Sequence, residues 1–282
     1  MILKNQILDR ENNKPIVWDA FYSTNAIKKP LVIFCHGYKG FKDWGAWDLV
    51  AKTFSDHDLF FIKFNFSHNG GTVENPIDFP DLEAFAENNY TKELNDLKDI
   101  LDLVCSESFK YKINIDVNNI TLIGHSRGGG ISILKASEDQ RITKLITWAS
   151  VSDFNSRFGS SEEVLKWKKE GVTYVLNGRT KQQMPHYYQF FEDFKANQKR
   201  LNIKHAAESI NIPYLIIHAK GDTSVKYTEA ESLHSWSNQS KVFEIEDSNH
   251  VFDATHPWEC EKLPENLKLV VEKSIRFINN TY

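Results

Sequence analysis

The stretch Ile120-Thr-Leu-Ile-Gly-His-Ser-Arg-Gly-Gly-Gly130 decides the fold of this 282-residue chain. Apolar residues lead into Gly-x-Ser-x-Gly, and a second apolar stretch covers residues 131–136. This order predicts a buried strand, a sharp turn and a helix, with Ser126 at the turn. Small flanking residues allow the close approach of strand and helix, and the helix N-terminus directs N–H groups toward whatever the serine attacks. An inert serine in a glycine turn is the alternative, which the flanking strand and helix disfavour.

Short apolar runs alternate with helical patterns on both sides of this stretch. Residues 31–35 and 59–66 form such runs before it, and residues 145–149, 213–219 and 241–245 form them after it. Continuous apolar runs are typical of strands buried on both faces. Their alternation with helices predicts an α/β fold with a mainly parallel sheet that helices cover on both faces. We expect one domain over residues 1–282, with an early strand near residues 15–22.

Residues 151–211 interrupt this alternation, because they are rich in aromatic and charged residues and show no clear strand. We predict that they form a small helical lid inserted into the domain. Phe154 is a candidate for lining an acyl pocket, although most lid aromatics are expected only to pack the lid. Two further substrate contacts are proposed from strand ends. They are Trp148 and His68. For His68, a solvent-facing position in its loop is the alternative.

A serine hydroxyl needs a base to accept its proton and a group to orient that base. Loops after the later strands of an α/β sheet are where such groups are expected, and they supply Asp222 and His250. The chain order Ser126, Asp222, His250 is the order expected for a nucleophile elbow. Asp153 remains an alternative acid. His256 is a weaker candidate for the base, because it lies farther from its strand. The other histidines considered are expected to pack or brace loops: His36, His125 and His218.

An oxyanion formed at Ser126 needs two N–H donors that are in place beforehand. We predict the backbone N–H of Arg127, the residue after the nucleophile, and that of Tyr38, in the loop after the strand at residues 31–35. Gly37 allows the backbone to turn toward the site, although His36-Gly37 could also be only a turn. The side chain of Arg127 either binds an acidic substrate group or braces the loop.

Composition excludes several other classes of protein. The formal net charge is −4, and no run of lysine and arginine is present, so we expect neither nucleic acid nor membrane as a partner. The three cysteines form no CxxC pair and are read as reduced thiols in a cytoplasmic protein. No spacing matches a zinc motif, P-loop or G-x-G-x-x-G, so we predict no metal site and no cofactor. The oligomeric state is expected to be a monomer or homodimer.

The sequence resembles the α/β-hydrolase superfamily, in the branch of dienelactone-hydrolase-like, cinnamoyl-esterase-like and serine-aminopeptidase-like proteins. The residues that carry the resemblance are His36-Gly37-Tyr38, Gly124-His-Ser-Arg-Gly-Gly129, Gly221-Asp222 and Asn249-His250. Longer matches cover residues 36–45, 64–67 and 256–257. The resemblance implies an eight-stranded sheet, a Ser-His-Asp triad and no cofactor. Arg127 departs from the pattern as a long cation beside the nucleophile.

Three functions fit these residues. The first is a carboxylic-ester hydrolase (EC 3.1.1.-) that acts on a small-molecule ester through an acyl-enzyme. The second is an aminopeptidase or amidase with the same triad, which would need acidic lid residues to anchor a peptide N-terminus. The acidic candidates are Glu162, Glu163 and Glu170. The third is a non-catalytic, hydrolase-like binding protein, which could lose any triad member freely. Because all three members are present, the third function is disfavoured. The first is favoured over the second because helical surface charge explains the acidic lid residues as well.

Overall fold

The computed structural model describes residues 1–25 and 27–280. Within these ranges, an eight-stranded sheet runs in the order β1-β2-β4-β3-β5-β6-β9-β10. In chain order its strands are β1 (Ile2–Arg10), β2 (Asn13–Phe21), β3 (Lys29–Cys35), β4 (Phe60–Phe64), β5 (Ile115–His125), β6 (Ile142–Trp148), β9 (Tyr214–Ala219) and β10 (Ser240–Ile245). The strands from β4 to β10 pair in parallel, whereas β2 pairs antiparallel with β1 and β4. The prediction of a mainly parallel sheet is therefore confirmed.

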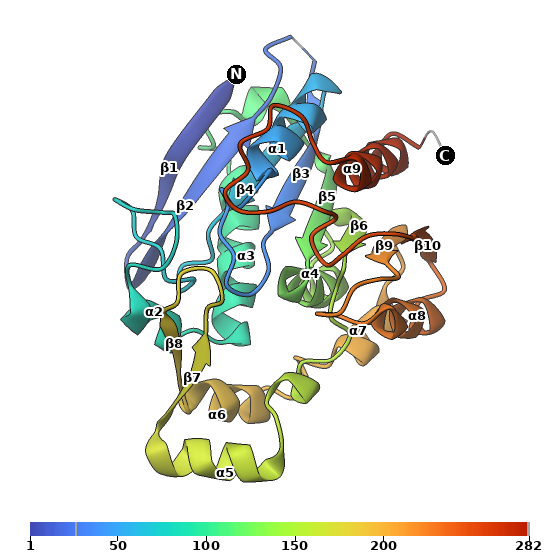
Figure 1. Ribbon diagram of the computed structural model, residues 1–282. Coiled ribbons are helices and arrows are strands. Elements are labelled where there is room, and N and C mark those ends of the chain that lie inside the picture. The colour runs from blue at the N-terminus through green and yellow to red at the C-terminus, as the bar shows by residue number, and fades with distance from the viewer. Residues whose placement is uncertain (26, 281–282) are drawn as a thin grey trace.

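Helices cover both faces of this sheet (Figure 1). On one face lie α1 (Trp47–Asp56) and α9 (Glu265–Ile278). On the other face lie α3 (Tyr90–Cys105), α4 (Arg127–Glu138), α7 (Ile203–Ser209) and α8 (Tyr227–Trp236). Shorter segments connect these layers: α2 (Leu82–Ala86) and two 3₁₀ turns, η1 (Lys112–Asn114) and η2 (Asn155–Arg157). None of the helices in the described residues is both long and apolar enough to cross a lipid bilayer.

The central strand β3 explains why both faces need helices. Leu31, Ile33 and Cys35 pack into the hydrophobic cluster of α3 and α4. The alternate residues Val32 and Phe34 pack into the cluster of α1 and α9. All five are at most 1% exposed. Burying a side chain such as Leu or Phe contributes about 1.5–3 kcal/mol, so a strand with no polar face is stable only between two apolar layers.

The N-terminal edge differs in part from the prediction. The strand expected near residues 15–22 is β2, but β1 lies outside it and is the true edge strand. The first ten residues gave no strand signal because β1 alternates between exposed and half-buried positions and contains no fully buried side chain. Pairing with β2, rather than burial of its own side chains, holds it in the sheet.

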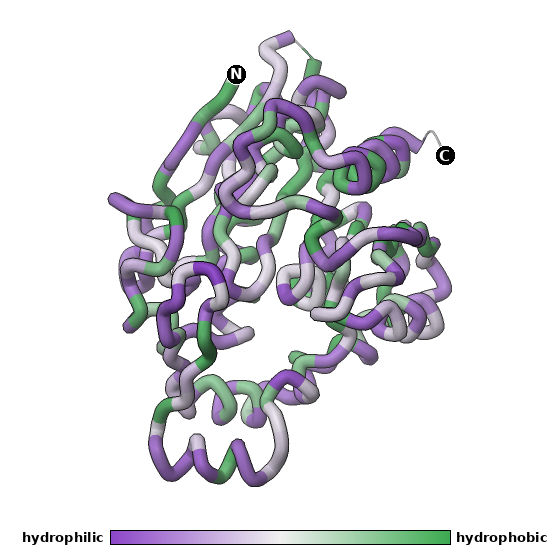
Figure 2. Tube along the Cα trace, in the orientation of Figure 1, coloured by the Kyte–Doolittle hydropathy of each residue, from purple (hydrophilic) through white to green (hydrophobic). Residues whose placement is uncertain are grey.

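The predicted lid interval contains two helices and a hairpin that project from the sheet. They are α5 (Ser161–Glu170), β7 (Val172–Leu176), β8 (Gln183–Tyr187) and α6 (Gln189–Ala196). The sequence prediction found no strand here, but β7 and β8 pair antiparallel as a separate two-stranded sheet. The helix α7, although inside the predicted interval, packs on α4. Figure 2 shows α5 as mostly hydrophilic, in keeping with Trp167 as its one buried residue.

Candidate active site

Ser126 stands at the junction between β5 and α4. Its backbone angles are φ 58° and ψ −121°, a conformation that non-glycine residues rarely adopt and that is found where a structure has a functional reason for strain. The neighbouring glycines make the turn possible. A Cβ on Gly124 would lie 2.3 Å from the carbonyl oxygen of Gly128, and a Cβ on Gly128 would lie 2.4 Å from that of Cys35. The small residues of the motif are therefore required by contact with backbone.

The structure places His250 within hydrogen-bond distance of both Ser126 and Asp222. The Oγ of Ser126 lies 3.0 Å from Nε2 of His250, and Nδ1 of His250 lies 2.7 Å from Oδ2 of Asp222. Because an ionised carboxylate only accepts hydrogen bonds, Nδ1 carries the proton and Nε2 is free to accept from the serine hydroxyl. Asp222 follows β9 and His250 follows β10, so strand ends supply both side chains.

Asp222 is held in one orientation by its own loop. Its Oδ1 accepts the backbone N–H groups of Ser224 and Val225 at 2.8 and 2.9 Å. Burial alone would raise the pKa of Asp222, but hydrogen bonds from His218 and His250 hold it well below its ordinary value. The carboxylate is therefore ionised at neutral pH.

The alternative acid, Asp153, has a different environment. Its carboxylate accepts the backbone N–H groups of Asn155 and Ser156 at 2.9 and 3.0 Å on an exposed turn. Among the described residues it makes no hydrogen bond to His250. Asp153 therefore stabilises the start of η2.

Three further histidines brace the loops around the site. His125 donates from Nε2 to the carbonyl oxygen of His250 at 2.9 Å, and burial lowers the pKa of His125 to about 3. His36 donates from Nδ1 to the carbonyl of Gly37 at 2.9 Å, and burial lowers the pKa of His36 to about 4. His256 accepts the N–H of Gly45 at 2.8 Å through Nδ1. His125 and His256 thus connect residues far apart in the chain, whereas His36 braces its own loop.

The candidate oxyanion donors lie on the two segments that meet at Ser126. Arg127 is the first residue of α4, where backbone N–H groups have no acceptor within the helix. The loop that carries Tyr38 lies directly against the nucleophile, because a Cβ on Gly37 would be 2.9 Å from Cβ of Ser126. In the described part of the chain, the N–H of Tyr38 has no acceptor. Both N–H groups are thus available to a bound oxyanion.

A cavity of about 690 Å³ lies between the sheet body and the lid, and Ser126 and His250 line it. Aromatic rings form much of its wall: Tyr90, Phe154, Phe158, Trp167 and Phe190. Phe154, the predicted pocket residue, is among them and stacks on Tyr90 with ring centroids 3.8 Å apart. A second cavity of about 250 Å³ also reaches Ser126 and His250, and its wall includes Trp44, Arg179 and His256. The nucleophile therefore borders two separate spaces.

Two predicted substrate contacts lie elsewhere. Trp148 is fully buried between the sheet and α9, where its Nε1 donates to Oγ of Ser274 at 3.1 Å. Its side chain therefore points into the core. His68 does not line either cavity that reaches Ser126, and its Nδ1 pairs with the hydroxyl of Ser67 at 2.8 Å. The loop after β4 turns toward β2 instead of the nucleophile.

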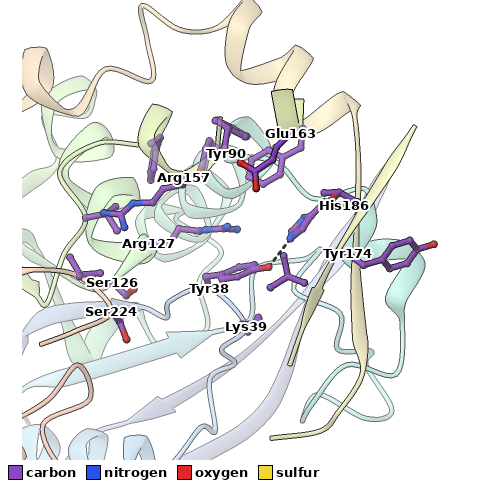
Figure 3. Close-up of a pocket in the computed structure, with 18 of the residues that line it drawn as sticks. Tyr38, Lys39, Tyr90, Ser126, Arg127, Arg157, Glu163, Tyr174, His186 and Ser224 are labelled. Carbon is purple, nitrogen blue, oxygen red and sulfur yellow. Dashed lines mark hydrogen bonds between the residues drawn. The ribbon is translucent and has the colours of Figure 1, made fainter. Parts of the chain in front are cut away.

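The sequence analysis missed the contact between the lid and the candidate oxyanion loop. The hydroxyl of Tyr38 donates to Nε2 of His186, a residue of β8, at 2.7 Å. Figure 3 shows this hydrogen bond at the edge of the larger cavity. His186 and Tyr90 both line that cavity, but neither belongs to a local motif. Only long-range packing brings them to the site.

One cluster of carboxylates has the composition of a metal site. Carboxylate oxygens of Asp19, Asp43 and Asp48 lie within 4.8 Å of one another. Ammonium groups already lie among them, since Nζ of Lys4 is 2.8, 2.6 and 2.9 Å from the three residues. Lys63 also pairs with all three, and Lys42 pairs with Asp19 and Asp43. The cluster therefore anchors the loop after Tyr38 by ion pairs.

Comparisons with known proteins bear on the family and the fold. A sequence model of the BD-FAE family matches residues 22–237. Comparison with curated proteins gave no match. Among solved structures, Est1E from Butyrivibrio proteoclasticus is 17% identical, with 98% of each chain covered and a TM-score of 0.72.

Two further structures are similar. Alpha/beta hydrolase domain-containing protein 10 from mouse is 17% identical, covering 98% of this chain and 99% of its own, with a TM-score of 0.71. A putative dienelactone hydrolase from Klebsiella pneumoniae is 14% identical, covering 99% and 98%, with a TM-score of 0.60. Together these structures identify the fold as that of the α/β hydrolases.

Proposed function

The chain belongs to the BD-FAE family, and from that premise we propose that it hydrolyses carboxylic esters through an acyl-enzyme on Ser126. The observation that carries the proposal is the pair of contacts that joins Ser126 to His250 and His250 to Asp222. A serine paired with a neutral imidazole, which a buried carboxylate orients, is the arrangement that makes an alcohol nucleophilic.

In the proposed reaction, His250 accepts the proton of Ser126 as the hydroxyl attacks the ester carbonyl. The N–H groups of Tyr38 and Arg127 stabilise the resulting oxyanion. His250 then protonates the departing alcohol, and water, activated by the same imidazole, releases the acid. Asp222 keeps the imidazole in the required tautomer and stabilises its charged form. No cofactor is required for any of these steps.

The two cavities that border Ser126 fit the two halves of an ester. The larger cavity is bounded by aromatic rings and would take the bulkier half. Est1E has been solved with ferulic acid bound, and that structure is 18% identical to this chain with a TM-score of 0.72. We therefore propose that the half of the ester in this cavity is aromatic or otherwise bulky.

An aminopeptidase is disfavoured by the charges around the larger cavity. The ammonium group of a peptide would meet three cations there: Lys39, Arg127 and Arg157. Among the described residues of the wall, Glu163 is the one acid, and its carboxylate already accepts the backbone N–H of Ser160 at 2.7 Å in a capping box. The other two acidic candidates of the lid, Glu162 and Glu170, do not line this cavity, so the described wall offers a peptide ammonium group no acid besides Glu163.

The experiment is a panel of activated esters of increasing acyl size, including hydroxycinnamoyl esters, beside aminoacyl amides. We expect ester turnover and little amide turnover. Ser126→Ala should lower kcat by about 10⁶-fold, as removal of a triad serine does. Ser235→Ala, on the exposed side of α8, is the matched control. Ester turnover retained by Ser126→Ala would refute the nucleophile, and faster amide turnover would favour the peptidase.

A further inference from the structure

The side chain of Arg127 extends from the residue beside the nucleophile into the larger cavity. Figure 3 shows its guanidinium between Tyr38 and Arg157, directed toward His186. The side chain is 13% exposed, so it is a largely desolvated cation that still borders the cavity. Catalysis in the proposed reaction uses only the backbone N–H of this residue, so the guanidinium has no role in it.

Aromatic rings hold the guanidinium in place. Its central carbon lies 4.2 Å from the ring centroid of Tyr38, 5.3 Å from that of Tyr90 and 5.5 Å from that of Phe190. A cation over aromatic faces is stabilised without hydrogen bonds being consumed. The rings come from the oxyanion loop, from α3 and from the lid, so three parts of the fold define the position of this cation.

The ion pair of Arg127 leaves most of its donors unused. Nη1 donates to Oε1 of Glu93 at 3.4 Å, which is a long contact for a charged pair. The same oxygen accepts from Asn88 at 2.8 Å. A guanidinium carries five N–H donors, and in the described residues the others have no acceptor. Glu93 is absent from the cavity wall, so a ligand would approach from the side opposite this acid.

The remaining charges of the cavity wall also favour an anion. Lys39 and Arg157 are cations, and Arg157 pairs with Glu229, outside the cavity. Glu163, the one acid that the described residues contribute to the wall, caps α5. His186 is neutral, because burial, with Arg127 and Lys39 nearby, lowers its pKa to about 3. A ligand carboxylate would therefore meet the guanidinium of Arg127, which is held in one orientation and has unused N–H donors. Lys39 and Arg157 add two further positive charges to the same wall.

We propose that the substrate is an ester with a carboxylate on the half that fills the larger cavity, and that the guanidinium of Arg127 binds this carboxylate. The proposal rests on the proposed function, since it names the substrate class of that site. A carboxylate would accept two parallel hydrogen bonds from the guanidinium fork, which neither a neutral acyl chain nor an ammonium group does.

The kinetic test compares monoethyl esters of succinic, glutaric and adipic acid with neutral ethyl esters of matched length, by pH-stat. We expect the best anionic ester to exceed its neutral partner in kcat/KM by about tenfold to a hundredfold. Arg127→Gln should remove this ratio and Arg127→Lys should restore it in part. A second series places the carboxylate on the alcohol half, because either half could enter the larger cavity.

Two control variants separate recognition from a general charge effect. Arg200→Gln removes an exposed arginine that pairs with Glu138, and should keep the anionic-to-neutral ratio. Arg157→Gln removes a second cation of the cavity wall and should lower the ratio less than Arg127→Gln does. If Arg127 acted only on the oxyanion, Arg127→Gln would slow anionic and neutral esters equally, and that result overturns the proposal.

A binding measurement keeps the two proposals distinguishable. Calorimetry on Ser126→Ala should detect glutarate or adipate, and Ser126→Ala/Arg127→Gln should bind it about tenfold or more weakly. Turnover of neutral esters without any anionic preference in either series would overturn this inference and leave the esterase intact. Failure to hydrolyse any ester would overturn the esterase, while loss of dicarboxylate binding in the double variant would still assign the anion site.

Discussion

The sheet body and the lid contribute to one cavity, but their structures are determined in different ways. In the body, Ser126 is positioned by backbone contacts so close that its flanking glycines accept no Cβ. In the lid, α5 buries a single side chain and β7 exposes Tyr174, Val175 and Leu176. The body thus fixes the reacting groups, whereas the lid supplies a wall that can vary. We infer that the body determines the reaction type and, through Arg127, the charge of the substrate, whereas the lid determines the size and shape of the group that the cavity accepts.

The strongest way to break this comparison is to remove a reacting group of the body. Asp222→Asn should lower kcat by about 10⁴-fold, because an amide beside Nδ1 favours the wrong imidazole tautomer. Asp153→Asn, at the start of the lid, should change kcat little, since this carboxylate only accepts N–H groups of its own turn. Initial rates of both variants and the unchanged protein on one activated ester give the comparison of kcat. The opposite ranking would assign the acid to Asp153 and contradict the division between body and lid.

The sequence predicted the body well because its determinants are local. A strand buried on both faces is a continuous apolar run, and the Gly-x-Ser-x-Gly turn needs small residues next to each other in the chain. Each of the three side chains that meet at the site follows a strand: Ser126 and Asp222 follow the buried ends of β5 and β9, and His250 follows the edge strand β10. Their distance in the chain is therefore no obstacle to predicting that they meet.

The lid was predicted less well because its determinants are long-range. In the hairpin of β7 and β8, the β-branched residues Val172, Thr173 and Val175 favour a strand. This short signal lies among residues with a helical pattern, so the sequence analysis did not assign a strand there. One error fell in the body: Trp148 of β6 was assigned to the pocket from its position at a strand end, and the alternation of the strand directs it into the core. The contact of His186 with Tyr38 joins residues 148 positions apart, which no local pattern encodes.

Two glycine substitutions, one in the body and one in the lid, test the comparison by their effects on the free energy of unfolding. Gly128→Ala places a Cβ 2.4 Å from the carbonyl of Cys35, and should lower the free energy of unfolding by about 1–3 kcal/mol. Gly178→Ala, in the turn of the lid hairpin, meets nothing within 4 Å and should change it by less than about 0.5 kcal/mol. Urea unfolding of both variants beside the unchanged protein measures the difference. Equal effects would mean that the body tolerates movement at the turn.

The smallest expected effect concerns how the lid is coupled to the body. Burial, with Arg127 and Lys39 nearby, lowers the pKa of His186 to about 3, compared with about 6.5 in an unfolded chain. Between these values the unfolded state binds the extra proton, so this residue makes stability fall as the pH falls. His186→Gln removes that contribution. From pH 6.5 to pH 5, the unchanged protein should lose about 1.5 kcal/mol more unfolding free energy than the variant.

The same measurement tests whether lid and body unfold together. At pH 8 His186 is neutral in both the folded and the unfolded state, so the difference in unfolding free energy between His186→Gln and the unchanged protein gives the cost of the lost contact with Tyr38. The change in this difference at lower pH then measures the effect of protonating His186. If the difference between variant and unchanged protein does not vary with pH, His186 gains its proton by lid opening before the body unfolds. Limited proteolysis at pH 5 would then cut the lid hairpin first, and the lid would be a separate unit of stability.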